Sequence, residues 1–180
     1  MNPRISILKS KLIYDGRVVK LRLDRIIEPG GVKATREIVA HPGSVVVLPL
    51  LPGNRVFLIR QFRYAAGQDL WELVAGGLEL GESVVQAARR ELLEETGYRA
   101  RRFRRLMSFF PSPGFVAEQM HLVLATGLTA GQAQPESDER ITTRVFSVAE
   151  LRKMLRANRI RDAKTLVGVS WLLLSNHRAD

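Results

Sequence analysis

The sequence predicts a mixed α/β fold that begins with an antiparallel β-meander. Three observations predict it. Apolar and polar residues alternate through residues 4–40, the apolar spacing becomes helical over residues 84–96, and strand-like segments return before two helical segments at the C-terminal end. This order of strands, one helix, strands and two helices is typical of a mixed α/β sandwich rather than of a regular βαβ winding.

Three strand-like stretches make up the expected meander. Asp15-Gly16 between the first two is a two-residue hairpin signal, and Pro29-Gly30-Gly31 marks the second turn. Three strands alone give a thin hydrophobic core, so we expect this sheet to pack on the rest of the chain or on a second subunit. We therefore divide the chain into an N-terminal meander, residues 1–42, and a main domain, residues 43–180.

The main domain opens with strands and then changes to a helix. The segments SVVVLPLL and RVFLIRQFR, separated by Pro52-Gly53-Asn54, predict a hairpin, and DLWELVA predicts a further short strand. Ser83 with Gln86 three residues later forms a capping box, and Gly97 is a helix stop. Together they predict a helix of about thirteen residues.

The remaining elements follow the same rules. QMHLVLATGL and ITTRVFSV predict strands on either side of a polar loop over residues 131–139. AELRKMLRAN and DAKTLVGVSWLLLSNH predict two helices, the second of them capped by Asp162.

Composition narrows the classes of function. The chain has 180 residues and no cysteine, which excludes disulfides, thiolate zinc sites and thiol nucleophiles. No apolar segment is long enough for a signal core or a membrane span, so we expect a soluble, cytoplasmic protein. The net charge is +10, and 22 of the 28 basic residues are arginine, which suits an anionic partner. The densest basic cluster, Arg99 to Arg105, is either a solvated strand edge or a nucleic-acid patch.

The predicted helix over residues 84–96 concentrates acidic side chains beside its apolar face. On a helical wheel Glu91 and Glu95 border the apolar arc, and Glu94 lies on the same flank. Like charges at this spacing destabilise an isolated helix, so something must compensate them. Neighbouring arginines could do so by ion pairing. A divalent cation is the other answer, because carboxylate oxygens suit Mg²⁺ and glycines such as Gly76 allow close approach.

The segment GGLELGESVVQAARRELLEETGY resembles the signature of the Nudix hydrolase family. The matching positions are Gly76, Glu82, Arg90, Glu91, Leu92, Glu94, Glu95, Gly97 and Tyr98, the last an aromatic residue where an aliphatic one is usual. The resemblance implies a Nudix-type α/β/α sandwich with a mixed sheet. It also implies hydrolysis of a nucleoside diphosphate linked to another group, with Mg²⁺ or Mn²⁺ as cofactor. By the family's roles the metal ligands are Glu91, Glu95, the Ala75 carbonyl and, as a further ligand, Glu94. Glu91 and Glu94 are also expected to serve catalysis, and Glu82 and Arg90 are partly structural.

Segments outside this box resemble the ADP-ribose pyrophosphatase subfamily. They are RQFRYAAG, WELVAGG, IRDAKTLVGVSWLL, the pair Arg36-Glu37, and a proline, Pro113, sixteen residues after Gly97. Val74 departs from the proline of many members. The resemblance implies a homodimer in which the N-terminal sheet is exchanged. It also implies that the substrate is bound by Arg36, Glu37, Arg63, Pro113 and Gly114.

The subfamily places a general base on a loop before the last strand. The matching residue is Glu139, with Glu136 and Asp138 as close competitors. The implied reaction converts ADP-ribose to AMP and ribose 5-phosphate. The alternatives are hydrolysis of GDP-mannose or another nucleoside diphosphate sugar, an RNA-directed Nudix protein, and a non-catalytic nucleotide sensor. Neither a membrane nor a nucleic acid is the expected partner.

Overall fold

The computed structural model describes residues 5–131 and 141–175. The chain folds into two compact units. One unit comprises the described residues up to Gly43 together with Phe110–Gln119. The other comprises Ser44–Phe109 and the described residues from Met120 onward.

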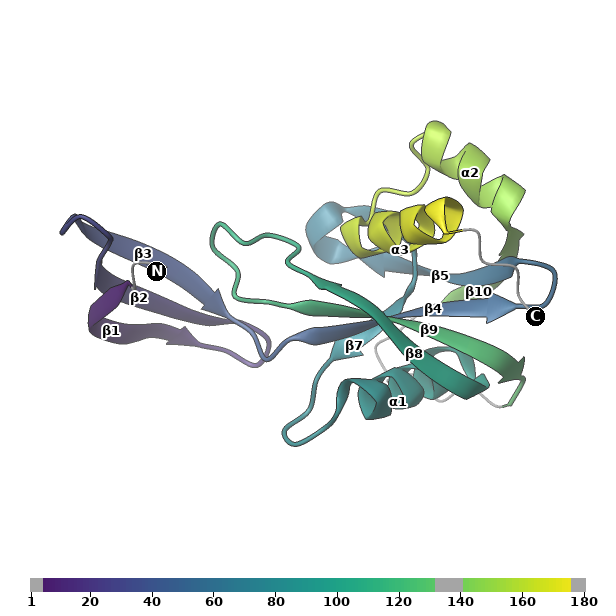
Figure 1. Cartoon of the computed structure of the whole chain (residues 1–180), viewed down its shortest axis with the longest axis horizontal. Helices are drawn as coiled ribbons and strands as arrows, with labels where there is room; N and C mark the ends of the chain where they lie inside the picture. The colour runs from purple at the N-terminus through teal and green to yellow at the C-terminus, as the bar shows by residue number, and fades with distance from the viewer. Residues whose placement is uncertain (1–4, 132–140, 176–180) are drawn as a thin grey trace. The chain divides into compact units, whose positions relative to one another are not determined.

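The first unit contains the expected antiparallel meander, in the order β1-β2-β3 (Figure 1). Its strands are β1 (Ser6–Asp15), β2 (Lys20–Ile27) and β3 (Lys33–Ala40). The first turn is longer than the two residues predicted, because β2 starts at Lys20 and the Gly16 N–H donates to the Val19 carbonyl at 2.9 Å. The sheet buries little of its apolar surface, and Ile7, Leu12 and Tyr14 are all more than half exposed.

The second unit is built on a mixed seven-stranded sheet. Its strands are β4 (Ser44–Leu51), β5 (Arg55–Arg63), β6 (Gln68–Glu72), β7 (Val74–Gly77), β8 (Arg99–Phe109), β9 (Met120–Thr129) and β10 (Thr142–Ser147). The main order is β10-β5-β4-β9-β8, while β6 pairs with β5 and β7 with β4. The β4–β9 pairing is parallel and the others are antiparallel, which makes the sheet mixed as predicted.

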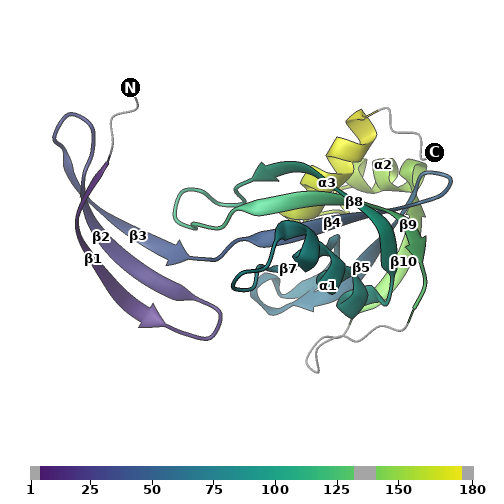
Figure 2. The same cartoon turned by 60° about the horizontal axis from the view of Figure 1, so that its bottom comes forward.

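Helices cover both faces of this sheet, as Figure 2 shows from a second angle. They are α1 (Val84–Thr96), α2 (Val148–Arg156) and α3 (Ala163–Leu174). Successive residues of β4 point to opposite faces of the sheet. Val45 and Val47 pack against α1 on one face, whereas Val46 and Leu48 pack against α2 and α3 on the other. Burying each such side chain contributes about 1.5–3 kcal/mol, so both layers are held firmly to the sheet. No helix in the described part of the chain could span a membrane.

The segment DLWELVA forms two strands where one was predicted. At Leu73 the backbone leaves the ladder, and its N–H donates to the Thr165 hydroxyl of α3 at 2.8 Å. The chain thereby moves from the edge of β5 to the edge of β4. This crossing brings β7 into contact with the acidic helix α1, where Gly76 lies against Glu91.

The ends of α1 are those that the sequence predicts. The Ser83 hydroxyl accepts from the Gln86 N–H, and the Gln86 side chain accepts from the Ser83 N–H. Gly97 ends the helix in the left-handed region at φ 73°, where a side chain is disfavoured. The helix therefore holds its acidic residues in a fixed register against the sheet.

Candidate active site

Helix α1 turns two of its three clustered carboxylates toward the protein interior. Glu91 and Glu95 are only 9% and 5% exposed, and they share the buried side of the helix with Ala87, Ala88 and Leu92. The side chain of Glu94 is 39% exposed. A buried carboxylate is costly unless it meets hydrogen bonds or a cation, so this helix face requires compensating positive charge.

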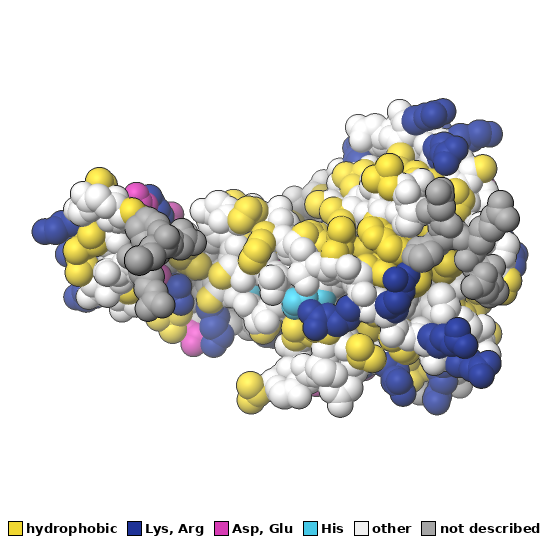
Figure 3. All heavy atoms as spheres, in the orientation of Figure 1, with side chains coloured by type: hydrophobic (Ala, Val, Ile, Leu, Met, Phe, Trp, Pro, Cys, Tyr) yellow, Lys and Arg dark blue, Asp and Glu magenta, His cyan; other side chains and the backbone are white. Residues whose placement is uncertain are grey.

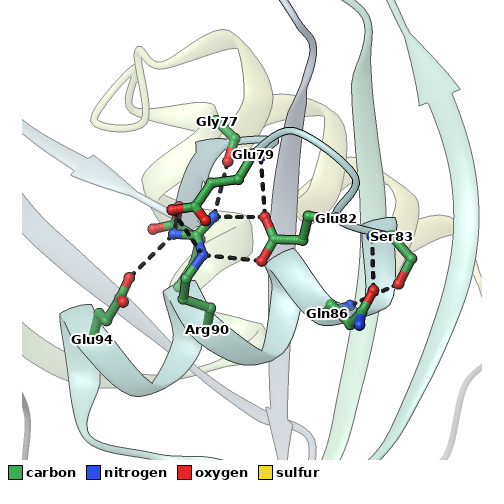
Figure 4. Close-up of polar contacts among 8 residues, drawn as sticks. Gly77, Glu79, Glu82, Ser83, Gln86, Arg90 and Glu94 are labelled. Atoms are coloured by element: carbon green, nitrogen blue, oxygen red, sulfur yellow. Dashed lines mark hydrogen bonds and ion pairs between the residues drawn. The ribbon is translucent and has the colours of Figure 1, made fainter.

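Arg90 supplies part of that charge and is the hub of the site (Figure 4). Its Nη1 donates to Glu91 Oε1 at 2.6 Å and to Glu94 Oε2 at 3.2 Å. Nε and Nη2 donate to the two oxygens of Glu82 at 3.0 and 2.9 Å, and Nη2 also donates to the Gly77 carbonyl at 3.0 Å. Glu79 lies further off, 3.7 Å from Nε. One guanidinium thus ties the loop before α1 to the acidic side of the helix.

These contacts change the ionisation of the partners. Hydrogen bonds from Arg90 hold the pKa of Glu82 below its usual range. The hydrogen bonds to Glu82 and Glu91 in turn raise the pKa of Arg90 despite its partial burial. Ion pairing by arginine, one of the two readings left open by the sequence, is therefore present for Glu91 and Glu94.

The Glu91 carboxylate lies directly against the backbone of Gly76. A Cβ built on Gly76 would be 1.8 Å from Glu91 Oε1 and 2.1 Å from its Cδ. Glycine at position 76 therefore leaves the Glu91 carboxylate in its place against β7, whereas any side chain there would displace it.

Replacing Gly76 with alanine is expected to push the Glu91 carboxylate out of its place. Activity should fall by about 100-fold, in the range found when a preorganised charged group is lost. Initial rates at saturating substrate test this expectation. Gly77→Ala, on the same strand, is the matched control, because a Cβ at Gly77 meets nothing within 4 Å and the substitution keeps the backbone carbonyl that Arg90 binds. Equal rates for Gly76→Ala and the wild type would show that the position of the Glu91 carboxylate does not depend on this glycine.

The donor set fits a hard divalent cation in its chemistry. Glu91, Glu94 and Glu95 offer only carboxylate oxygens, which Mg²⁺ and Mn²⁺ prefer, and the backbone approach at Gly76 leaves Glu91 close to the β7 chain. In the described residues, however, no three acidic or histidine side chains are already gathered as an ion would hold them. Arg90 binds one oxygen of Glu91 and one of Glu94, so an ion at this site would share these two carboxylates with the guanidinium.

A second charged group lies at the ends of β5 and β6. Arg63 donates from Nε and Nη2 to the two oxygens of Glu72 at 2.8 and 2.7 Å. Glu72, fully buried, also accepts from Lys164 of α3 at 2.5 Å. Neither Glu72 nor Lys164 is among the site residues predicted from the sequence. The sequence does contain a signal for this pair: Glu72 is a charged residue within the mainly apolar segment DLWELVA, and Lys164 is a charged residue within a mainly apolar helix.

Arg63 is linked electrostatically to the acidic helix. Its hydrogen bonds to Glu72 raise its pKa against the opposing effect of burial, and the negative charge of Glu95 acts in the same direction. The subfamily resemblance assigns Arg63 to substrate binding. The effect of Glu95 on its pKa places Arg63 within electrostatic reach of a carboxylate on α1.

Acid is expected to weaken the fold through Glu72. Burial opposes ionisation of this group, but Arg63 and Lys164 together bring its pKa below the ordinary value. A carboxylate with a depressed folded-state pKa stabilises the protein above its unfolded pKa of about 4.3, and this stabilisation is lost as the pH falls further. Urea unfolding between about pH 7 and 3 should show this decline, and Glu72→Gln should flatten it. An unchanged pH profile in Glu72→Gln would show that other groups cause the decline.

Four predicted substrate residues lie in the first unit. Arg36 and Glu37 are exposed on β3, where Arg36 pairs with Glu28, and Pro113 and Gly114 occupy an exposed turn. Helix α1 belongs to the second unit, so a substrate contact shared by these four residues and α1 stays a prediction. Glu139, Glu136 and Asp138 lie outside the described residues.

The basic cluster Arg99 to Arg105 forms most of β8, at one edge of the sheet. Lys and Arg side chains gather at the end of the larger unit where β8 and β9 lie (Figure 3). Arg89 lies 5.6 Å from the centre of the Phe103 ring, and Arg104 lies 5.9 Å from that of Trp171. Each of these two rings thus has an arginine of the same protein over one of its faces.

Comparison with known proteins identifies the arrangement around α1. The NUDIX domain family matches residues 40–166, which include the whole of the helix and its preceding loop. The chain belongs to the Nudix family. Members of this family generally need divalent metal ions.

Similar proteins extend this match over nearly the whole chain. A Bacillus methanolicus protein named methanol dehydrogenase activator is 38% identical over 93% of this chain and 91% of its own length. An ADP-ribose pyrophosphatase of Bacillus subtilis is 35% identical over 90% and 89%. A crystal structure of an ADP compounds hydrolase has a TM-score of 0.83 at 21% identity, covering 94% of this chain and 92% of the other. The Nudix resemblance and the predicted fold class are confirmed, and the chain is a Nudix hydrolase.

Proposed function

We propose that this Nudix hydrolase cleaves the diphosphate bond of ADP-ribose, or of a related nucleoside diphosphate sugar. With ADP-ribose the products are AMP and ribose 5-phosphate. The observation that carries the proposal is the Nudix box, matched at every position except Tyr98, with Glu91 and Glu95 buried on one side of α1 and Glu91 seated against Gly76. The choice of substrate is supported by relatives named ADP-ribose pyrophosphatase, among them proteins of Bacillus subtilis and Mycobacterium tuberculosis.

A divalent ion, Mg²⁺ or in its place Mn²⁺, would be held by Glu91, Glu94, Glu95 and the Ala75 carbonyl. When bound, such an ion neutralises phosphate charge and acidifies a water molecule.

Protein side chains do the remaining work. Arg90 holds Glu91 and Glu94 on the acidic side of α1 and fixes the preceding loop through Glu82. The guanidinium of Arg63 donates hydrogen bonds to phosphate oxygens of the substrate, for which its planar geometry is suited. Glu139, with Glu136 and Asp138 as the alternatives, accepts the proton of the attacking water.

A homodimer completes the proposal. The first unit leaves apolar side chains such as Ile7, Leu12 and Tyr14 more than half exposed, and a second subunit would cover them. Arg36 and Glu37, with Pro113 and Gly114, would then contact the nucleotide or sugar. Light scattering tests this point, since a monomer at micromolar concentration would contradict it.

The direct test of the function compares substrates. The purified chain is incubated with ADP-ribose or GDP-mannose, with Mg²⁺, with Mn²⁺ or with chelator, and the products are separated by chromatography. Formation of AMP and ribose 5-phosphate that stops with chelator is the expected result. Faster cleavage of GDP-mannose would reassign the substrate. No cleavage of either compound would overturn the proposal.

A second candidate function is activation of a dehydrogenase, favoured by the 38% identical Bacillus methanolicus relative. The test adds the chain to a purified methanol dehydrogenase and records alcohol oxidation. If activation proceeds through hydrolysis, it should disappear in Glu95→Gln. A chain that hydrolyses ADP-ribose but leaves the dehydrogenase rate unchanged has only the first function.

A further inference from the structure

Four charged side chains form a continuous chain from the N-terminal end of α3 to the end of β5. Asp162 Oδ1 accepts from Lys164 Nζ at 3.0 Å, Lys164 donates to Glu72 at 2.5 Å, and Glu72 accepts two hydrogen bonds from Arg63. Asp162 is also fixed, because it caps α3 and accepts from the Thr165 hydroxyl at 2.5 Å. The chain thus ties β5 and β6 to the first turn of α3.

Arg63 is the most exposed member of this chain. The side chains of Glu72, Lys164 and Asp162 are 1%, 9% and 15% exposed, whereas that of Arg63 is 42% exposed. Arg63 uses Nε and Nη2 for Glu72, and its Nη1 makes no hydrogen bond to any residue that the structure describes. The inner groups are therefore enclosed, and one edge of the guanidinium remains available to an anion.

The four groups carry two positive and two negative charges. If Lys164 lost its charge, Arg63 would be the one cation left in contact with Glu72 among the described residues. Because a buried carboxylate binds the nearest cation strongly, the guanidinium would be drawn inward and its outer edge would become less positive. Lys164 therefore acts on the exposed Arg63 through Glu72, the carboxylate that both cations bind.

We infer that Lys164 is a positioning residue for the substrate: by holding Glu72, it fixes Arg63 with its Nη1 edge directed to the phosphate oxygens of a nucleoside diphosphate. This inference rests on the proposed function, because it takes the anion that Arg63 meets to be the substrate. A purely structural ion pair, which only anchors α3 to the sheet, would lower stability without changing how Arg63 meets an anion.

The experiment is a double-mutant cycle with Lys164→Met, Arg63→Gln and the double variant. Lys164→Met is expected to raise KM for ADP-ribose about tenfold, the usual scale for a residue one step behind a ligand, with kcat changed less than about threefold. In the Arg63→Gln background it should add almost nothing to KM, because the two residues act in series. Lys153→Met, an exposed lysine of α2, is the matched control and should leave KM unchanged.

A second measurement does not depend on turnover. In the wild type the ¹⁵N resonance of Arg63 Nε should be sharp and should shift on titration with inorganic pyrophosphate. In Lys164→Met it should broaden, and the affinity for pyrophosphate should fall by a similar factor. If the wild type fails to cleave ADP-ribose yet these changes occur, the proposed function fails and the positioning role stands.

The inference is overturned by additive effects on KM, or by a lower melting temperature with KM and the Arg63 resonance unchanged. If Lys164→Met does not fold, Lys164→Gln carries the same comparison, because it also removes the charge.

Discussion

Glu95→Gln is expected to reduce turnover of ADP-ribose by at least about 100-fold, the scale found when a preorganised charge at the reacting centre is removed. The amide keeps the size of the side chain but removes the negative charge, and Glu95 is only 5% exposed on the face of α1 beside Glu91. Because metal ligation needs an ionised carboxylate, the loss should appear in kcat and should be only partly recovered at high Mg²⁺. Steady-state rates over a range of Mg²⁺ concentrations provide the measurement.

Glu150→Gln is the matched control for this substitution. Glu150 lies in the first turn of α2, where it caps the helix, and glutamine can keep the hydrogen bond from the Ser147 N–H. This variant should retain wild-type kcat. Turnover by Glu95→Gln equal to that of Glu150→Gln would remove Glu95 from the proposed metal ligands.

Arg90→Met is expected to damage both activity and stability. Loss of the guanidinium leaves Glu82, Glu91 and Glu94 close together without the cation that joins them. Breaking one partner of a partly buried ionic group costs about 2–3 kcal/mol, and displacement of Glu91 should lower kcat by about 100-fold. Urea unfolding and initial rates measure the two effects.

Lysine at position 90 is not expected to restore the function of Arg90. The neighbouring Arg89 provides the control substitution. One ammonium group cannot reproduce donors directed at Glu82, at Glu91 and at the Gly77 carbonyl together, so Arg90→Lys should recover little activity. Arg89 is exposed and lies over Phe103, so Arg89→Met should change kcat less than about twofold. Full activity in Arg90→Lys would show that charge alone, without the fork geometry, is sufficient.

Periodicity and caps predicted most of the fold. The limits of α1 follow from Ser83, Gln86 and Gly97, because local hydrogen bonds decide where a helix begins and ends. Two details were not predicted, and the first of them depends on a tertiary contact. The strand predicted over DLWELVA divides at Leu73 because Thr165, 92 residues away, takes its N–H. The first hairpin turn extends over four residues instead of two, with Gly16 bonded to Val19.

The candidate site was predictable only as far as one helix determines it. A helical wheel places Glu91 and Glu95 on the same side, and both are buried there. The role of Arg90 as a hub depends on the loop that brings Glu82 back to the helix, which no spacing rule encodes. Lys164 and Glu72 meet across 92 residues of sequence, so their contact appears only once α3 lies on the sheet.

Binding of Mn²⁺ tests the central claim most directly, that carboxylates of α1 hold a divalent ion. Free Mn²⁺ is followed by electron paramagnetic resonance during titration of the wild type, Glu91→Gln, Glu95→Gln and the control Glu150→Gln, without substrate. The account predicts saturable binding by the wild type and by Glu150→Gln, and affinity at least about tenfold weaker in the other two variants. Equal affinity in all four proteins would contradict it, because the ion would then be held elsewhere.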